Sequence, residues 1–335
     1  MAAAAAALAA APGAALAWGS TGHRLIGRAA IESLPPELPP FLRTEAAATA
    51  VGEASREPDR SRGAGKAHDA DRDPGHYVNA DDEGKIGGVV PIDAAPPTRE
   101  AYETALRAAG TSSWKAGYLP YSILEDWQQL AKDFAYWRAD DAAAAHATDA
   151  DRRAWFIADR AAREAQIIVD LGALSHFVGD GSMPLHVSAH FNGWGPGPNP
   201  RGFTQEKVHI LWEGPYVRQV ATEGSVRAAM APFEDCGCPI ERRVGTYLAA
   251  DLAAVIPFYE LQKAGAFRFE SANGGDPRGV AFTVGRLAAG AAELRDEIVL
   301  AWRASAHGKV GWPEVDVADI EAGNVDPFEN LLGAD

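Results

Sequence analysis

Apolar residues recur at helical spacing along most of this 335-residue chain. Near the start, Ile26, Ala29 and Leu34 share one helical face, and the pair Pro35-Pro36 ends that helix. Comparable patterns predict further helices over residues 38–48, 99–109, 122–139, 151–180, 205–222, 239–264 and 279–305. Because the alternation of apolar and polar residues that marks a half-buried strand is lacking, the sequence predicts an all-α fold with a single, mostly helical domain.

Three stretches lack this periodicity. Residues 52–98 carry clusters of Gly, Asp and Pro, and residues 187–203 are rich in Gly, Pro and Asn. A long irregular region inside a compact domain is usually functional, so we expect the first of these stretches to contribute to a site. The last thirty residues, 306–335, are interpreted as a C-terminal tail, which leaves residues 18–305 as the helical domain.

The N-terminal segment predicts export. Residues 1–17 are apolar and rich in Ala, and they end in Ala15-Leu16-Ala17, the pattern of a signal-peptidase cleavage site. Their apolar run is too short to span a membrane. We therefore expect a signal peptide that is cleaved between Ala17 and Trp18, and a mature protein that is periplasmic or secreted. A disordered Ala-rich tail is the alternative, because no basic residue precedes the apolar run.

Composition narrows the functional classes. Hydrophobic residues make up 47% of the chain, which is enough for a sizeable core. The formal net charge is −15, whereas proteins that grip nucleic acid through their surface are normally basic. A polyanionic partner would therefore have to be attracted locally, by a metal ion or by a small basic patch. The two cysteines, Cys236 and Cys238, could close only a very small loop, so the fold should not depend on a disulfide.

Candidate metal ligands gather at the end of a long predicted helix. His176 and Asp180 are four residues apart there, so their side chains share one helix face. His186 follows beyond a proline break, and His209 and Glu213 repeat the four-residue spacing. Imidazole and carboxylate groups are preferred ligands of Zn²⁺, whereas Ca²⁺ takes about six to eight oxygen ligands. The pattern therefore favours zinc.

Two further histidines suggest more than one ion. His23 lies near the start of the first predicted helix, and His76 lies in the irregular region beside acidic residues. A mononuclear catalytic site needs only three ligands from the protein, and five histidines with carboxylates nearby exceed that number. The remaining histidines are interpreted as ordinary surface or core residues: His68, His146, His190 and His307.

The residues that carry this chemistry occur in an ordered set of motifs: Trp18-Gly-x-x-Gly-His23, Asp59-x-x-Arg62, His76-Tyr-Val-Asn, His176-x-x-x-Asp180-x-x-x-x-x-His186 and His209-x-x-x-Glu213. The set resembles the superfamily of zinc-dependent single-strand nucleases (the S-one/P-one type) and bacterial zinc-dependent phospholipase C. The resemblance covers residues 18 to 215, and beyond them only the helical character agrees. It implies a mostly helical domain of this type with three zinc ions in one cleft.

The resemblance also implies a ligand set. One zinc would take Asp59, His76, His176 and Asp180, and a second would take His186, His209 and Glu213. The third would take His23, Asp180 as a bridge, and the free amino group and carbonyl oxygen of Trp18. An α-amine and its own carbonyl close a five-membered chelate, which requires that Ala17 has been removed.

The implied activity is hydrolysis of a phosphodiester. Zinc would favour ionisation of an attacking water near neutral pH. Arg62 would hold a phosphate oxygen, and Asp59 could orient the water. The structural alternative for Arg62 is a surface salt bridge. We therefore expect an exported hydrolase, a nuclease or phosphodiesterase that acts on single-stranded DNA or RNA and on 3′-nucleotides, without an obligate protein partner.

The two branches of the superfamily leave alternatives open. The compact Trp18-to-His23 spacing is nuclease-like, as is the segment after His76, where Tyr77 would stack on a base and Asn79 would hydrogen-bond it. Core packing is the alternative role for Tyr77. Glu213 stands where the nucleases usually carry aspartate and the phospholipase carries glutamate. A phospholipase C-like hydrolase of phospholipid headgroups is therefore the second candidate, and a non-catalytic zinc-binding protein is the candidate from another class.

Overall fold

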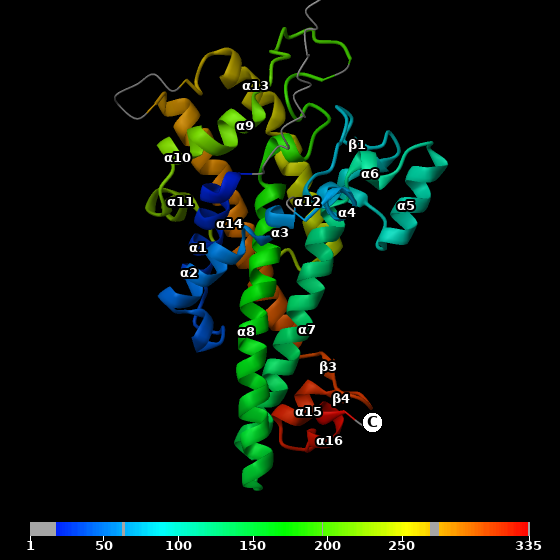
Figure 1. The fold of residues 1–335 in the computed structure, drawn as a ribbon, viewed down its shortest axis with the longest axis vertical. Coiled ribbons are helices and arrows are strands. Elements are labelled where there is room, and N and C mark those ends of the chain that lie inside the picture. The colour runs from blue at the N-terminus through cyan, green and yellow to red at the C-terminus, as the bar shows by residue number, and fades with distance from the viewer. Residues whose placement is uncertain (1–17, 62–63, 196, 269–274, 334–335) are drawn as a thin grey trace, which may run out of the picture.

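The structure is a computed structural model that describes residues 18–61, 64–195, 197–268 and 275–333. Its three longest helices are α7 (Leu119–His146), α8 (Ala150–Gly181) and α14 (Pro277–Ser305). Helices α7 and α8 lie side by side as a long hairpin, and α14 packs against both (Figure 1). The prediction of a single, mostly helical fold is confirmed.

Two small antiparallel sheets accompany the helices in the described residues. Strand β1 (Lys85–Ile86) pairs with β2 (Val90–Pro91), and β3 (Lys309–Val310) pairs with β4 (Val315–Asp316). The shorter α-helices are α1 (Gly19–Glu32), α2 (Glu45–Ala54), α3 (Glu57–Arg60), α4 (Lys66–Arg72), α5 (Arg99–Ala108), α6 (Ser113–Ala116), α9 (His209–Leu211), α10 (Val217–Val220), α11 (Glu223–Ala229), α12 (Ile240–Leu252), α13 (Val255–Lys263), α15 (Val317–Glu321) and α16 (Phe328–Leu332). Single 3₁₀ turns cover Pro40–Leu42, Asp73–His76, Ile92–Ala94 and Pro184–His186, and a π-helical turn covers Trp212–Tyr216. The stretch predicted to be irregular, 52–98, thus contains α3, α4 and the β1–β2 hairpin.

Helix α2 is displaced from the helix predicted over residues 38–48. That segment contains only the 3₁₀ turn Pro40–Leu42 before α2 begins. The start of α2 is set by Thr44, whose hydroxyl accepts a hydrogen bond from the backbone N–H of Ala47 at 3.1 Å. A side-chain cap of this kind satisfies one of the free N–H groups at a helix start, which apolar periodicity does not reveal.

The helices predicted over residues 205–222 and 239–264 are both interrupted. The first begins only at His209 and widens into a π-helical turn around Pro215, which has no N–H with which to continue the regular pattern. The second is divided into α12 and α13. The stretch Ile240–Lys263 is long and apolar enough in composition to cross a membrane, but 39% of its apolar 18-residue window is buried inside the protein, and core helices share these properties.

Close packing between α2 and α8 positions the candidate site. A Cβ atom at Gly172 of α8 would lie 2.4 Å from the Cβ of Ala54 in α2, so only glycine fits there. This approach places the carbonyl oxygen of Ser55, directly after α2, where it accepts a hydrogen bond from Nδ1 of His176 at 2.8 Å. A packing contact one turn away therefore fixes the ring of a predicted metal ligand.

The described part of the segment interpreted as a C-terminal tail, residues 306–333, is folded instead. Strands β3 and β4 with α15 and α16 pack at the end of the α7–α8 hairpin that points away from α1 (Figure 1). A second hydrophobic core joins them, and its buried members include Phe156, Val317 and Ile320. The rings of Trp155, Phe156 and Phe328 meet edge to face, with centroids 5.3 to 5.9 Å apart. Helices this short leave little periodicity in the sequence.

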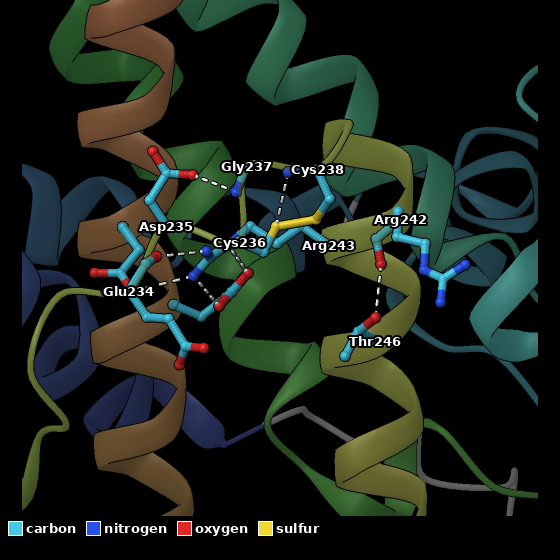
Figure 2. Close-up of a disulfide and its surroundings, with 10 residues drawn as sticks. Glu234, Asp235, Cys236, Gly237, Cys238, Arg242, Arg243 and Thr246 are labelled. Atoms are coloured by element: carbon cyan, nitrogen blue, oxygen red, sulfur yellow. Dashed lines mark hydrogen bonds and ion pairs between the residues drawn. A yellow bond between two sulfur atoms is a disulfide. The ribbon is translucent and has the colours of Figure 1, made fainter.

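A disulfide joins Cys236 and Cys238 in the exposed loop between α11 and α12 (Figure 2). The same loop is anchored by Arg243, which donates to the carbonyl oxygen of Glu234 at 2.7 Å and to both carboxylate oxygens of Glu293 at 2.8 and 2.7 Å. Because the bridge encloses a single residue and the loop has these other anchors, it restrains little of the chain.

Candidate metal centre

Eight of the predicted ligands come together beside the C-terminal end of α8. They are supplied by helix ends and turns that are far apart in the sequence, and all are buried except Asp59, which is half-buried. The eight are His23, Asp59, His76, His176, Asp180, His186, His209 and Glu213. Their ligand atoms fall into three overlapping or neighbouring groups, each within 4.8 Å, and these groups could hold metal ions.

Asp180 belongs to the first group and also lies beside two members of the second. Its Oδ1 is 3.4 Å from Nε2 of His23, while its Oδ2 is 3.1 Å from Nδ1 of His76 and 3.3 Å from Nε2 of His176. Oδ1 therefore faces His23 while Oδ2 faces His76 and His176, which is the geometry that a bridging ligand requires. Asp59 joins His76 and His176 within the same range of 4.8 Å.

The third group is formed by His186, His209 and Glu213. Nε2 of His186 lies 3.1 Å from Nε2 of His209, and the latter nitrogen lies 2.9 Å from Oε2 of Glu213. The spacing of four residues predicted this pairing, although the chain passes from α9 into the π-helical turn between the two residues.

Backbone carbonyls select which nitrogen of each ring faces the groups. Nδ1 of His176 contacts the carbonyl of Ser55, Nδ1 of His209 contacts that of Phe191 at 2.8 Å, and Nδ1 of His186 contacts that of His76. A nitrogen in contact with a carbonyl must carry the proton, so the neutral ring presents its Nε2 lone pair inward. Two such lone pairs 3.1 Å apart repel each other unless a cation lies between them or one ring is protonated. The donor set and its orientation fit a metal ion.

Electrostatics in the first group also favour positive charge. Burial lowers the pKa of His176, but the charge and hydrogen bond of Asp180 and the charge of Asp59 outweigh it and raise this pKa to about 9. A site that holds a proton this firmly on a buried ring is a site that stabilises a cation. A metal ion and a proton compete for the same nitrogen.

Trp18 lies beside this group at the start of α1. Its indole is fully buried, donates from Nε1 to the hydroxyl of Ser182 at 2.7 Å and packs edge-on against Trp212. Ser182 comes two residues after Asp180, so the indole fastens the start of α1 to the end of α8. The carbonyl of Trp18 accepts the first hydrogen bond of α1, from the N–H of Gly22 at 3.0 Å, and its backbone has a positive φ of 38°.

Two predicted features lie outside the described residues. They are Arg62, the predicted phosphate ligand, and the signal peptide of residues 1–17 with its cleavage point. The amino group that Trp18 would expose after cleavage is therefore also outside the described geometry. All three stay predictions.

A cleft of about 820 Å³ opens over the metal-binding groups. Its lining includes His76, His186 and His209 together with the predicted substrate residues Tyr77 and Asn79. The hydroxyl of Tyr77 donates to the carbonyl of Trp114 at 3.2 Å, and the side-chain amide of Asn79 donates to the carbonyl of Lys115 at 2.9 Å. Both side chains are half-buried, so they line the cleft and also hold α6 in place.

Sequence reasoning missed several side chains of this cleft, among them Lys66, Trp114, Lys115 and Phe191. None belongs to the ordered motifs. A signal was present for Trp114, because a large aromatic residue stands alone in the polar, Gly-flanked segment 110–117. Such a residue has no neighbouring apolar position with which to form a buried helical face.

The histidines interpreted as ordinary residues behave as expected where they are described. The ring of His190 stacks on Trp194 at 3.7 Å, its Nδ1 accepts from the N–H of Gly195, and its Nε2 lies 2.9 Å from a carboxylate oxygen of Asp82. Trp194 is itself buried and is not among the residues that line the cleft. His146 contacts a backbone carbonyl and His307 is exposed, while the side chain of His68 is not described.

No protein-family model matches this chain, and no curated protein matches its sequence. The functional argument therefore rests on the geometry of the metal-binding groups and the cleft above them.

Proposed function

We propose that this protein is an exported, zinc-dependent phosphodiesterase whose substrate is single-stranded nucleic acid. The observation that carries the proposal is the convergence of eight buried or half-buried ligands, three of which line one substrate-sized cleft. Five of them are imidazoles, which favours zinc over the alkaline-earth ions. The division into three groups, with His176 shared by two of them and Asp180 close to the ligands of both, supports a site for three ions.

The chain's own residues would divide the chemical work. Bound zinc would supply Lewis acidity to the phosphate ester and to the attacking water. Asp59, the one half-buried ligand, would orient that water and accept its proton. Arg62, three residues further along, would bind a non-bridging phosphate oxygen. The carbonyl contacts at Nδ1 of His176, His186 and His209 keep the ligand nitrogens oriented throughout.

A phospholipase C-like activity is the second candidate. It is favoured by the carboxylate of the third group being Glu213, as in the phospholipase branch. The cleft mixes aromatic and charged side chains, and Tyr77 and Asn79 lie along it, which supports a nucleotide as the first choice. A non-catalytic zinc-binding protein would share the metal site and lack turnover.

One set of measurements separates these functions. The secreted protein is purified without dialysis, its metals are quantified by elemental analysis, and single-stranded DNA, RNA and phosphatidylcholine are offered in parallel, with and without chelator. We expect close to three zinc ions per chain and chelator-sensitive hydrolysis of the nucleic acids. One zinc ion or fewer would contradict the trinuclear proposal. Hydrolysis of phosphatidylcholine alone would assign the second candidate, and full zinc without turnover would assign the non-catalytic class.

A further inference from the structure

Two large aromatic side chains of the cleft are exposed to solvent. Trp114 has 61% of its surface exposed to solvent, and Phe191 has 47%. Among the described residues, only four large aromatic side chains are exposed: Trp114, Phe191, Phe233 and Trp312. Exposed aromatic rings inside a concave, partly charged cleft are typical of a surface that binds a ligand.

The backbone holds Trp114 firmly against the segment that carries His76. Tyr77 donates to the carbonyl of Trp114, and the N–H of Asn79 donates to the carbonyl of Ala116 at 2.7 Å. Gly117 has a φ of 79°, and a Cβ there would lie 2.0 Å from the carbonyl oxygen of Tyr77, so glycine is required for this approach. The indole is therefore presented to the cleft by a rigid support.

Phe191 is held in the same way beside the third metal-binding group. Its carbonyl accepts the hydrogen bond from Nδ1 of His209, and the carbonyl of the preceding His190 accepts one from the hydroxyl of Tyr259 at 2.6 Å. The N–H of Gly193 donates to the same hydroxyl at 3.1 Å. The two aromatic rings are thus each tied through the backbone to a residue in or next to the metal site.

Charged side chains accompany the rings. Lys66 and Lys115 line the cleft, as do Asp69 and Asp73, so the protein's own charges balance there although the whole chain carries −15. Cations bound below the cleft would make it positive. Flat rings combined with local positive charge are the arrangement by which proteins bind single-stranded nucleic acid without reading its sequence.

We propose that Trp114 and Phe191 are base-stacking platforms on the cleft, so that the substrate is a single strand bound through successive bases rather than a lone phosphate ester. Lys66 and Lys115 would contact its phosphates. This inference rests on the proposed function and specifies its substrate class. A volume of about 820 Å³ suits a ligand larger than one base, whereas the four charged side chains disfavour an acyl chain.

The test uses Trp114→Ala and Phe191→Ala, with Trp114→Phe as the conservative variant. The matched control is Trp312→Ala, because Trp312 is 73% exposed and lies in the turn between β3 and β4. These two strands are at the opposite end of the α7–α8 hairpin (Figure 1). Each protein is assayed on an oligothymidylate, on phosphatidylcholine and on bis(4-nitrophenyl) phosphate, which has no nucleobase. Binding of a fluorescent, hydrolysis-resistant phosphorothioate oligonucleotide is measured separately by anisotropy.

We expect each Ala variant to weaken oligonucleotide binding and its kcat/KM by about 5- to 150-fold, and to lower the kcat/KM for bis(4-nitrophenyl) phosphate much less. Trp114→Phe should restore most of the loss, and Trp312→Ala should behave as the parent. Equal effects on the oligonucleotide and on bis(4-nitrophenyl) phosphate, or none on oligonucleotide binding, would overturn the inference. If the parent binds the oligonucleotide without hydrolysing either ester, the anisotropy loss still supports the stacking surface while the proposed catalytic function fails. Loss of phosphatidylcholine hydrolysis without oligonucleotide binding would overturn the inference in favour of a lipid site.

Discussion

Asp140 provides a sharp test of the electrostatics in the long helical hairpin. Its side chain is fully buried on α7, where it faces Asp159 of α8. Burial raises the pKa of Asp140 from 3.8 to about 8, the charge of Asp159 adds to this effect, and Arg160 and Arg163 oppose it only in part. Because the pKa of Asp140 is higher in the folded protein than in the unfolded chain, the protonated group contributes to the free energy of unfolding. This contribution is fully present below the unfolded pKa of 3.8 and is lost as the pH rises through the folded pKa of about 8.

The cost follows from the size of the shift. Each pH unit between the two pKa values removes about 1.4 kcal/mol from the free energy of unfolding. At pH 7, a little more than three units above the unfolded value, the penalty is on the order of 4 kcal/mol. Asp140→Asn has nearly the same shape and cannot ionise, so this penalty should disappear. The variant should match the parent protein at about pH 4 and exceed its stability by a few kcal/mol at about pH 8.

The measurement is urea unfolding followed by circular dichroism at a series of pH values, compared as differences between variant and parent so that effects of the unchanged metal site cancel. Asp141→Asn is the matched control, because Asp141 is the next residue on α7, has a side chain with 48% exposure, and pairs with Arg160. It reports the general effect of removing one negative charge. A gain for Asp140→Asn that is the same at every pH, or a loss at about pH 8, would refute the reasoning.

Three further predictions concern the metal site and the C-terminal core. Glu213→Gln should lower the zinc content by up to one ion per chain in elemental analysis, while Glu206→Gln, an exposed control, should leave it unchanged. Phe156→Ala should lower the free energy of unfolding by about 3–5 kcal/mol in urea titrations, because the ring is buried between helices and the C-terminal residues. A chain that begins at Ala17 instead of Trp18 should bind one zinc ion less tightly and turn over more slowly, since an amide nitrogen cannot replace an amine as a ligand. Identical zinc content and rates for the two chains would show that Trp18 is not a ligand.

The sequence predicted contacts within a helix better than contacts between segments. The four-residue spacings placed His176 with Asp180 and His209 with Glu213, and both pairs meet in the structure. The partners that orient these rings could not be predicted, because they are backbone carbonyls supplied by packing. The carbonyl that fixes His176 lies 121 residues away at Ser55, and nothing in its identity marks it.

The same reasoning explains why the wall of the cleft was missed. The docking of α6 depends on hydrogen bonds that its backbone carbonyls accept from the side-chain amide and the main-chain N–H of Asn79, and on the positive φ of Gly117. Backbone carbonyls are common to every residue, so no sequence pattern marks these acceptors. The C-terminal core was missed for a related reason, since α15 and α16 are five residues each and give no sustained period. Local periodicity predicts long helices, and short elements are fixed by the surfaces on which they pack.

The metal site also bears on the stability of the fold itself. Asp180 and Glu213 are fully or almost fully buried, and burying a carboxylate is costly unless positive charge compensates it. In the first group a protonated His176 can supply that charge, because its pKa is raised to about 9. In the third group the two Nδ1 contacts direct both imidazole lone pairs toward the same small space as the carboxylate of Glu213. Ion binding there would remove a lone-pair repulsion and neutralise a buried charge in one step. Metal binding should therefore stabilise the folded chain by mass action as well as enable chemistry, and the helix ends that supply the ligands should be the first parts to loosen when the ions are removed.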